Sequence, residues 1–226
     1  MEKRRAITTE EIDNILGEHI TSLDEYIRPY IQKDVDPITE HVYVVYEGDA
    51  IYEELKTGGH RGLCRAKDGY IYIRNDVDWS PNLLIHEFIH RLSRNRKFVK
   101  AWPIYQSVLG LDQPRNCLHY VNEIITEMIA VSITGIEEER NPYTFGLDLM
   151  RQFANKVGAH NLIKAYFEGN VGFLKRKLSK CYKNFAGNFA VLISCYSSAQ
   201  SETGGIEDMR NALEAEYKLQ IIIGIL

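Results

Sequence analysis

The segment His86-Glu87-Phe88-Ile89-His90 brings together two histidines and a glutamate. Residues four apart on an α-helix lie on the same face, so His86 and His90 could bind one metal ion together. Paired imidazoles of this kind are typical of Zn²⁺ sites. Glu87, which lies between them, would then be placed to take a proton from an attacking water molecule. The spacing therefore predicts a zinc centre with Glu87 as its general base.

The flanking residues predict a helix from about residue 81 to 95. Ser80 is a good N-cap, and Pro81 suits the first helical position. Apolar residues at 83, 84, 88, 89 and 92 give the helix a broad buried surface. The alternative interpretation is a core helix whose histidines only form hydrogen bonds with their neighbours.

A catalytic zinc ion normally takes three protein ligands, so two histidines do not complete the site. Residues 118–130 predict a second apolar helix, on which His119, Glu123 and Glu127 are spaced by four and share one face. A carboxylate one turn from a ligand is well placed to hold a ligand imidazole. This helix is therefore expected to supply the rest of the site.

Together, the HEFIH segment and the later run Asn122-Glu123-Ile124-Ile125-Thr126-Glu127 resemble the gluzincin zinc metallopeptidases. In that family a second helix carries the signature N-E-x-x-[ST]-[DE]. The resemblance covers roughly residues 70 to 130. It implies that Glu123 is the third zinc ligand and that Glu127 orients a ligand imidazole.

Gluzincins usually add a tyrosine or histidine that donates a hydrogen bond to the developing oxyanion. The candidates in this chain are His119, Tyr120, Tyr143 and His160. We place His119 and Tyr143 with Glu87 in the expected catalytic set. His119 could instead line the cleft or replace Glu123 as a ligand.

Cys64 offers a rival third ligand, because peptide deformylases pair HExxH with an upstream cysteine. The glycine-cysteine-leucine-serine pattern of that family is missing around Cys64. A lone cysteine is more often a small buried apolar residue. We therefore favour Glu123 over Cys64.

The composition fits one compact enzyme domain. The chain has 226 residues, of which 45% are hydrophobic and 26% charged, and its net charge is −4. The negative charge argues against a nucleic-acid-binding protein. Four cysteines without a CxxC pair indicate reduced thiols, and no apolar signal segment follows the basic N-terminus. We expect a cytoplasmic protein, or one exported without a classical signal peptide, and no membrane span.

The hydrophobic pattern predicts an α+β fold, and the gluzincin resemblance implies that this fold is zincin-like. A capping box at Thr8 and Glu11 opens a helix that extends to about residue 33, and strands are expected at 41–46 and 69–74. Helices are expected at about 142–157, 159–167, 170–180, 184–198 and 205–220, after a loop at about 97–116. We predict a single domain, 1–226, with an N-lobe of about 1–97, containing the sheet and metal helix, and a helical C-lobe of about 98–226.

These features favour a zinc-dependent metalloprotease that acts on a protein or peptide substrate. In zincins the edge strand before the metal helix pairs with an extended substrate, and the strand at 69–75 is our candidate. Two alternatives remain. One is a zinc hydrolase of a non-peptide amide, and the other is a non-catalytic, zinc-stabilised protein-binding module.

Overall fold

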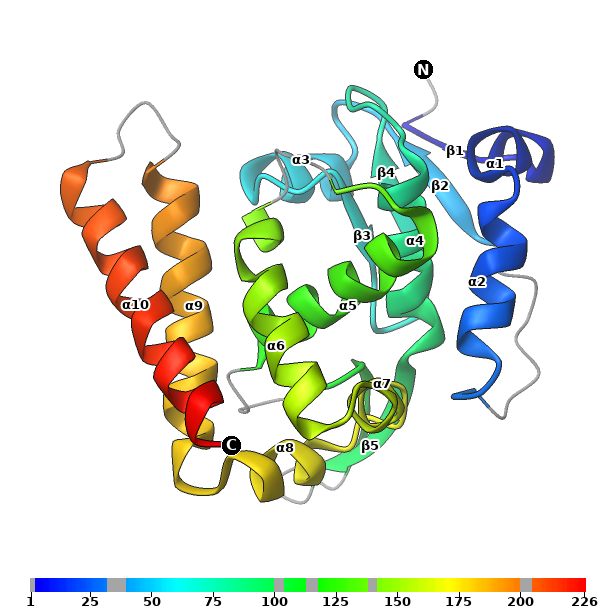
Figure 1. Cartoon of the computed structure of the whole chain (residues 1–226). Coiled ribbons are helices and arrows are strands. Elements are labelled where there is room, and N and C mark those ends of the chain that lie inside the picture. Colours follow the sequence, from blue (N-terminus) through cyan, green and yellow to red (C-terminus); the bar gives the residue numbers. More distant parts are fainter. Residues whose placement is uncertain (1–2, 32–39, 100–103, 113–117, 138–141, 200–204) are drawn as a thin grey trace. The chain divides into compact units, whose positions relative to one another are not determined.

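The computed structural model describes residues 3–31, 40–99, 104–112, 118–137, 142–199 and 205–226. Its elements are a mixture of helices and short strands, which confirms the α+β class (Figure 1). The chain divides into two compact units. The first contains Met1–Leu109 and Ala130–Ile136, and the second contains Gly110–Ile129 and Glu137–Leu226.

The first unit is built on a four-stranded sheet in the order β1-β2-β4-β3. The strands are β1 (Arg4–Ala6), β2 (Val42–Val45), β3 (Gly62–Cys64) and β4 (Ile71–Arg74). β2 and β4 are parallel, whereas β1 pairs with β2 and β3 pairs with β4 in antiparallel fashion. β4 is thus an inner strand with partners on both sides. The expectation that the strand at 69–75 forms the sheet edge was wrong, because the short β3 occupies that edge.

Three helices accompany this sheet: α1 (Thr9–Leu16), α2 (His19–Ile27) and α3 (Ala50–Thr57). The predicted capping box is present, with the Thr8 hydroxyl accepting from the Glu11 amide and the Glu11 carboxylate accepting from the Thr8 amide. The single helix expected to about residue 33 is broken at Gly17, whose φ of 53° lies in the left-handed region. The sequence pattern also missed α3, which Asp49 caps at the Ile51 amide.

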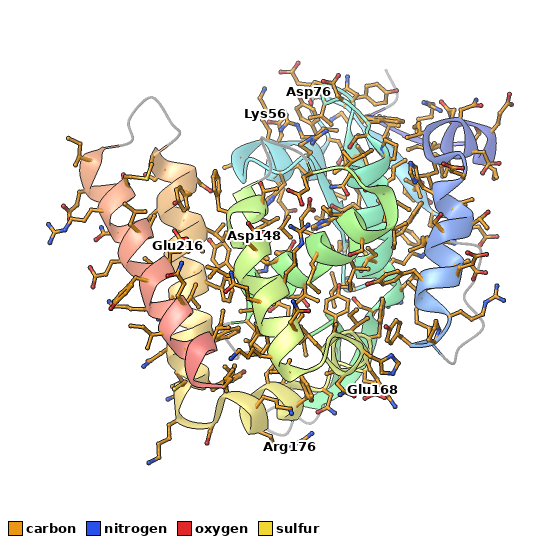
Figure 2. The ribbon with its side chains drawn as sticks, in the orientation of Figure 1. Lys56, Asp76, Asp148, Glu168, Arg176 and Glu216 are labelled. Atoms are coloured by element: carbon orange, nitrogen blue, oxygen red, sulfur yellow. The ribbon has the colours of Figure 1, made fainter. Side chains whose placement is uncertain are left out.

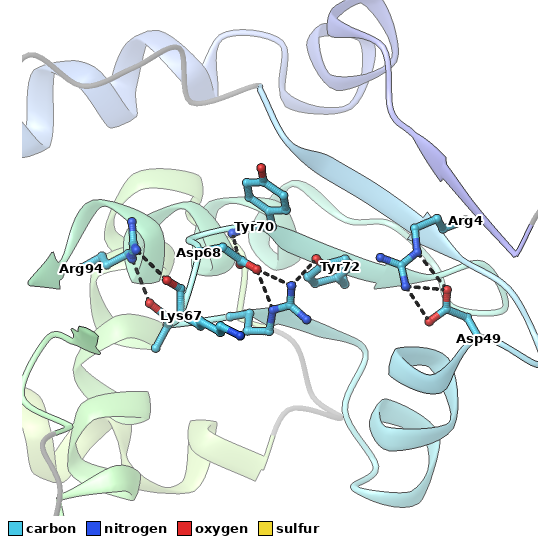
Figure 3. Close-up of polar contacts among 9 residues, drawn as sticks. Arg4, Asp49, Lys67, Asp68, Tyr70, Tyr72 and Arg94 are labelled. Atoms are coloured by element: carbon cyan, nitrogen blue, oxygen red, sulfur yellow. Dashed lines mark hydrogen bonds and ion pairs between the residues drawn. The ribbon is translucent and has the colours of Figure 1, made fainter. Parts of the chain in front are cut away.

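α4 (Pro81–Leu92) is the predicted metal helix. It ends three residues earlier than expected, because the chain continues as β5 (Arg94–Val99), which pairs antiparallel with β6 (Ile104–Leu109). Residues 97–99 and 104–109 of the loop expected at 97–116 therefore belong to two paired strands, whereas residues 100–103 and 113–116 lie outside the described ranges. Arg94 donates hydrogen bonds to the carbonyl oxygens of Ala66 and Lys67, and so fastens the β3–β4 turn to the end of α4 (Figure 3).

The same region of the sheet is held by two further arginines (Figure 3). Arg65 bonds to Asp68 and donates to the Tyr72 hydroxyl at 3.0 Å. Arg4 of β1 forms an ion pair with the buried Asp49 at the start of α3. These contacts fix the β3–β4 turn to β4, and β1 to the start of α3.

The second unit is helical, as predicted for the C-terminal part of the chain. It contains the first part of α5 (His119–Thr134), a 3₁₀ turn at Pro142–Gly146, α6 (Leu147–Val157), α7 (Ala159–Phe167), α8 (Val171–Leu178), a second 3₁₀ turn at Ser179–Cys181, α9 (Tyr182–Ala199) and α10 (Ile206–Ile225). α9 and α10 lie side by side (Figure 1). None of the helices in the described ranges is both long enough and apolar enough to span a bilayer.

Candidate metal centre

The imidazoles of His86 and His90 converge on α4. Their Nε2 atoms lie 3.1 Å apart, and the two side chains are only 7% and 5% exposed. Two nitrogens bound to one tetrahedral zinc ion at about 2.0–2.1 Å would stand about 3.3 Å apart. The separation in the protein is close to that edge of a coordination tetrahedron, although a hydrogen bond between the rings would give a similar distance.

Local sequence explains why α4 holds its histidines rigidly. The Ser80 hydroxyl accepts a hydrogen bond from the Leu83 amide at 3.1 Å and starts the helix as predicted. At the other end, the buried Ser93 hydroxyl donates to the carbonyl oxygen of His90. The helix is buried around much of its circumference by four residues with no exposed area: Leu84, Ile85, Phe88 and Ile89.

Glu87 is buried against the backbone of the edge strand β3. A Cβ atom added at Gly62 would lie 3.0 Å from the Glu87 Oε1 atom and 3.2 Å from its Cγ atom. Only a residue without a side chain leaves this room. The glycine therefore allows the Glu87 carboxylate to lie directly beside β3.

Cys64 lies two residues further along β3 and is buried. Burial, and then the nearby charge of Glu87, raise the pKa of the Cys64 thiol well above its usual value. Zinc binds the thiolate form of cysteine, so this environment disfavours Cys64 as a ligand.

α5 carries the three residues predicted to share a face. Glu127 is fully buried, Glu123 is 12% exposed and His119, at the first position of the helix, is 53% exposed. The buried Asn122 side chain accepts a hydrogen bond from the Leu111 amide at 2.8 Å. The chain just before α5 is thereby tied to the helix.

The hydrogen bond between Leu111 and Asn122 places the next residue, Asp112, near His119. The Asp112 Oδ2 atom lies 3.3 Å from the His119 Nδ1 atom, and this hydrogen bond raises the pKa of the imidazole above its ordinary value. His119 Nδ1 also lies 3.9 Å from the Glu123 Oε1 atom. The sequence pattern did not single out Asp112, since an isolated aspartate in a loop carries no periodic signal.

Within the described ranges, one set of side chains has the composition and spacing of a metal site. His86, His90 and Glu123 each offer one ligand atom, and these atoms all lie within 4.8 Å of one another. The three predicted ligands could therefore hold a metal ion. Cys64 is not part of this set.

The other residues considered for the oxyanion are placed as follows. Tyr143 lies in the 3₁₀ turn that precedes α6 and is partly buried. The Tyr120 hydroxyl accepts a hydrogen bond from Ser194 of α9, which gives it a structural role. His160 is exposed on α7. The catalytic role expected for Tyr143 stays a prediction.

No protein family, curated protein or solved structure matches this chain significantly. The gluzincin resemblance therefore depends on the residues of α4 and α5 alone.

Proposed function

We propose that the protein is a zinc-dependent metalloprotease of the gluzincin type. The observation that supports this most is the convergence of the buried His86 and His90 nitrogens at 3.1 Å. Glu123 belongs to the same potential ligand set. Two imidazoles and one carboxylate are the donors that many catalytic zinc sites use, and three protein ligands leave a fourth position for water or substrate.

The chemistry of these donors suits a divalent cation. His86, His90 and Glu123 would hold the ion, and Glu127 would fix the orientation of a ligand imidazole. When bound, Zn²⁺ polarises a carbonyl group and lowers the pKa of water.

Glu87 would act as the general base. Its carboxylate would take a proton from the attacking water and pass that proton to the leaving amine. Its burial beside Gly62 holds it in one place, which general-base catalysis requires. A metal that served only to stabilise the fold would have no use for such a base, so this residue argues against a purely structural zinc site.

A peptide is the substrate class that β3 favours. Among the described strands, β3 pairs with β4 alone, so its other edge has backbone groups that an extended peptide could bind. Gly62 of β3 contacts the proposed base. A peptide aligned on this strand would therefore run beside Glu87. His119, held by Asp112, and Tyr143 are our candidates for hydrogen-bond donors to the oxyanion.

The proposal is tested by digesting a mixed peptide library with zinc-supplied full-length protein and identifying the products by mass spectrometry. We expect cleavage by the wild type and none by Glu87→Gln, which should keep its zinc. Glu54→Gln makes the same chemical change at an exposed position of α3 and should cleave normally. Equal cleavage by wild type and Glu87→Gln would overturn the proposal. A zinc-loaded wild type that cleaves no peptide would favour a non-peptide amide substrate or a binding module.

A further inference from the structure

The exposed large apolar side chains of the described residues are concentrated on α9 and α10. Ile206 is 92% exposed and Tyr217 is 64% exposed, although large apolar side chains are usually buried. Figure 2 shows side chains that project from the face of α10 pointing away from α9. The full set, apart from Val191 of α9, belongs to the C-terminal end of the chain: Ile206, Met209, Leu213, Tyr217, Ile221 and Leu226.

On α10 these residues form a continuous stripe, which we call the outer stripe: Ile206, Met209, Leu213, Tyr217 and Ile221. Successive members are three or four residues apart, so they share one face of the helix. The opposite face is also apolar, and it is buried within the unit through Ala212, Ala215, Leu219, Ile222 and Ile223. α10 therefore has two apolar faces, and packing inside the unit covers only one of them.

A row of charges runs along one border of the outer stripe. Each of its first four members is followed directly by a charged residue, and the signs alternate along the helix: Glu207, Arg210, Glu214 and Lys218. Within the helix, Arg210 pairs with Glu207 at 3.6 Å and Lys218 with Glu214 at 2.6 Å. All four side chains are more than half exposed, so they remain accessible to another molecule.

We propose that the outer stripe binds a second copy of this chain, with the two α10 helices antiparallel in a two-fold symmetric dimer. Antiparallel helices place the same border of each helix against its counterpart. In the antiparallel partner the charge row runs in the reverse order, so each charged residue faces a residue of opposite sign. Glu207 would meet the partner's Lys218, and Arg210 would meet the partner's Glu214, each pair occurring twice by symmetry.

This register also aligns the apolar residues. The two-fold axis would pass close to Leu213, so the two Leu213 side chains would pack on each other at the centre. Met209 would pack near the partner's Tyr217. In a parallel two-fold pair, each charge row would face the opposite border of the partner helix, so the two rows would not meet and these ion pairs could not form.

The size of the surface sets the expected strength. A 20-residue helix is about 30 Å long and about 10 Å across with its side chains. One helical face of that size falls within the range of about 300–600 Å² of large apolar patches and below the roughly 800 Å² that each partner contributes to a standard interface. We therefore expect a reversible dimer with a dissociation constant on the order of 10 µM.

Sedimentation velocity of the full-length protein, from about 1 to about 200 µM, tests the proposal. The wild type should pass from monomer to dimer across this range. Leu213→Glu should weaken dimerisation at least about a hundredfold, because it places charges at the apolar centre. Leu213 is half-exposed, so this change should leave the fold and the circular dichroism spectrum unaltered.

A charge exchange gives the sharper test. Arg210→Glu or Glu214→Arg alone would set like charges against each other twice and should weaken the dimer about tenfold. The double variant restores opposite charges and should recover wild-type affinity to within about threefold. Glu25→Lys on the exposed side of α2 is the charge-changing control and should have no effect.

Three results would overturn the proposal. The first is a wild type that stays monomeric throughout the concentration range, which would show that the outer stripe does not bind a second copy of this chain. The second is a dimer that survives Leu213→Glu, since the contact would then lie elsewhere. The third is a double charge variant as weak as the single variants, which would exclude the antiparallel register. The predicted dimer does not depend on the metal centre.

Discussion

Replacing Gly62 with alanine should slow hydrolysis without removing the metal. The new Cβ atom would lie 3.2 Å from the Glu87 Cγ atom and 3.0 Å from its Oε1 atom. Carbon atoms pack best at about 3.5–4.0 Å, so the Glu87 side chain must move by about 0.4 Å. A displacement of 1 Å at a catalytic group costs about a hundredfold in rate. If the logarithm of the rate falls in proportion to the displacement, a shift of about 0.4 Å lowers the rate about sixfold.

The assay compares kcat and zinc content for Gly62→Ala with those of the wild type, using a peptide that the wild type cleaves. We expect kcat to fall about three- to tenfold at unchanged zinc content. Gly187→Ala is the matched control, because a Cβ atom there would meet nothing within 4 Å. An unchanged kcat for Gly62→Ala would refute the assignment of Glu87, in its observed position, as the base. Loss of zinc would show that Gly62 supports the metal instead.

Three further outcomes are expected. Asn122→Ala should lower the free energy of unfolding by about 1–3 kcal/mol in denaturant titrations, because the buried Leu111 amide loses its acceptor; an unchanged stability would contradict this. Hydrogen bonds from Arg5 lower the pKa of Glu11 from 4.5 to about 2, so its stabilising contribution is present above pH 4.5 and is lost as the pH falls through about 2. In an NMR titration, Arg5→Gln should bring that pKa back toward 4.5, and a pKa that stays near 2 would rule out Arg5 as the main cause. Cys64→Ala should keep its zinc in elemental analysis, and loss of the metal would revive the cysteine-ligand alternative.

The two site helices were predictable because their signals are local. α4 has a serine cap, a proline at its first position and apolar residues at helical spacing, and each of these acts within a few residues. α5 has a long run of mostly apolar residues, which also favours a buried helix. Both helices therefore begin within one residue of their expected starts, although α4 ends three residues earlier and α5 four residues later than expected.

Features that depend on distant contacts could not be read in the same way. β3 has three residues, too few to show strand alternation, and it exists because β4 provides a neighbour. The pairing of Asp112 with His119 depends on the Asn122 hydrogen bond to the Leu111 amide. The same holds for the antiparallel pair of β5 and β6, whose strand-forming residues were outweighed in the sequence by the turn signals of Pro103 and Gly110.

α10 illustrates a third case. Its apolar residues are plain in the sequence, but two faces of the helix carry them. Which face is buried depends on α9 and α6, which contact α10 and leave the outer stripe exposed. The exposed outer stripe therefore became visible only in the folded protein.

The central claim is that His86, His90 and Glu123 hold a zinc ion. Elemental analysis of zinc per chain tests it most directly, with wild type, His90→Ala and Glu123→Ala purified side by side and supplied with zinc. The account predicts about one zinc ion per chain in the wild type and loss of most of it in both variants. A wild type that binds no zinc would leave α4 as a core helix with hydrogen-bonded histidines. Stoichiometric zinc in Glu123→Ala would contradict the assignment of Glu123 as the third ligand.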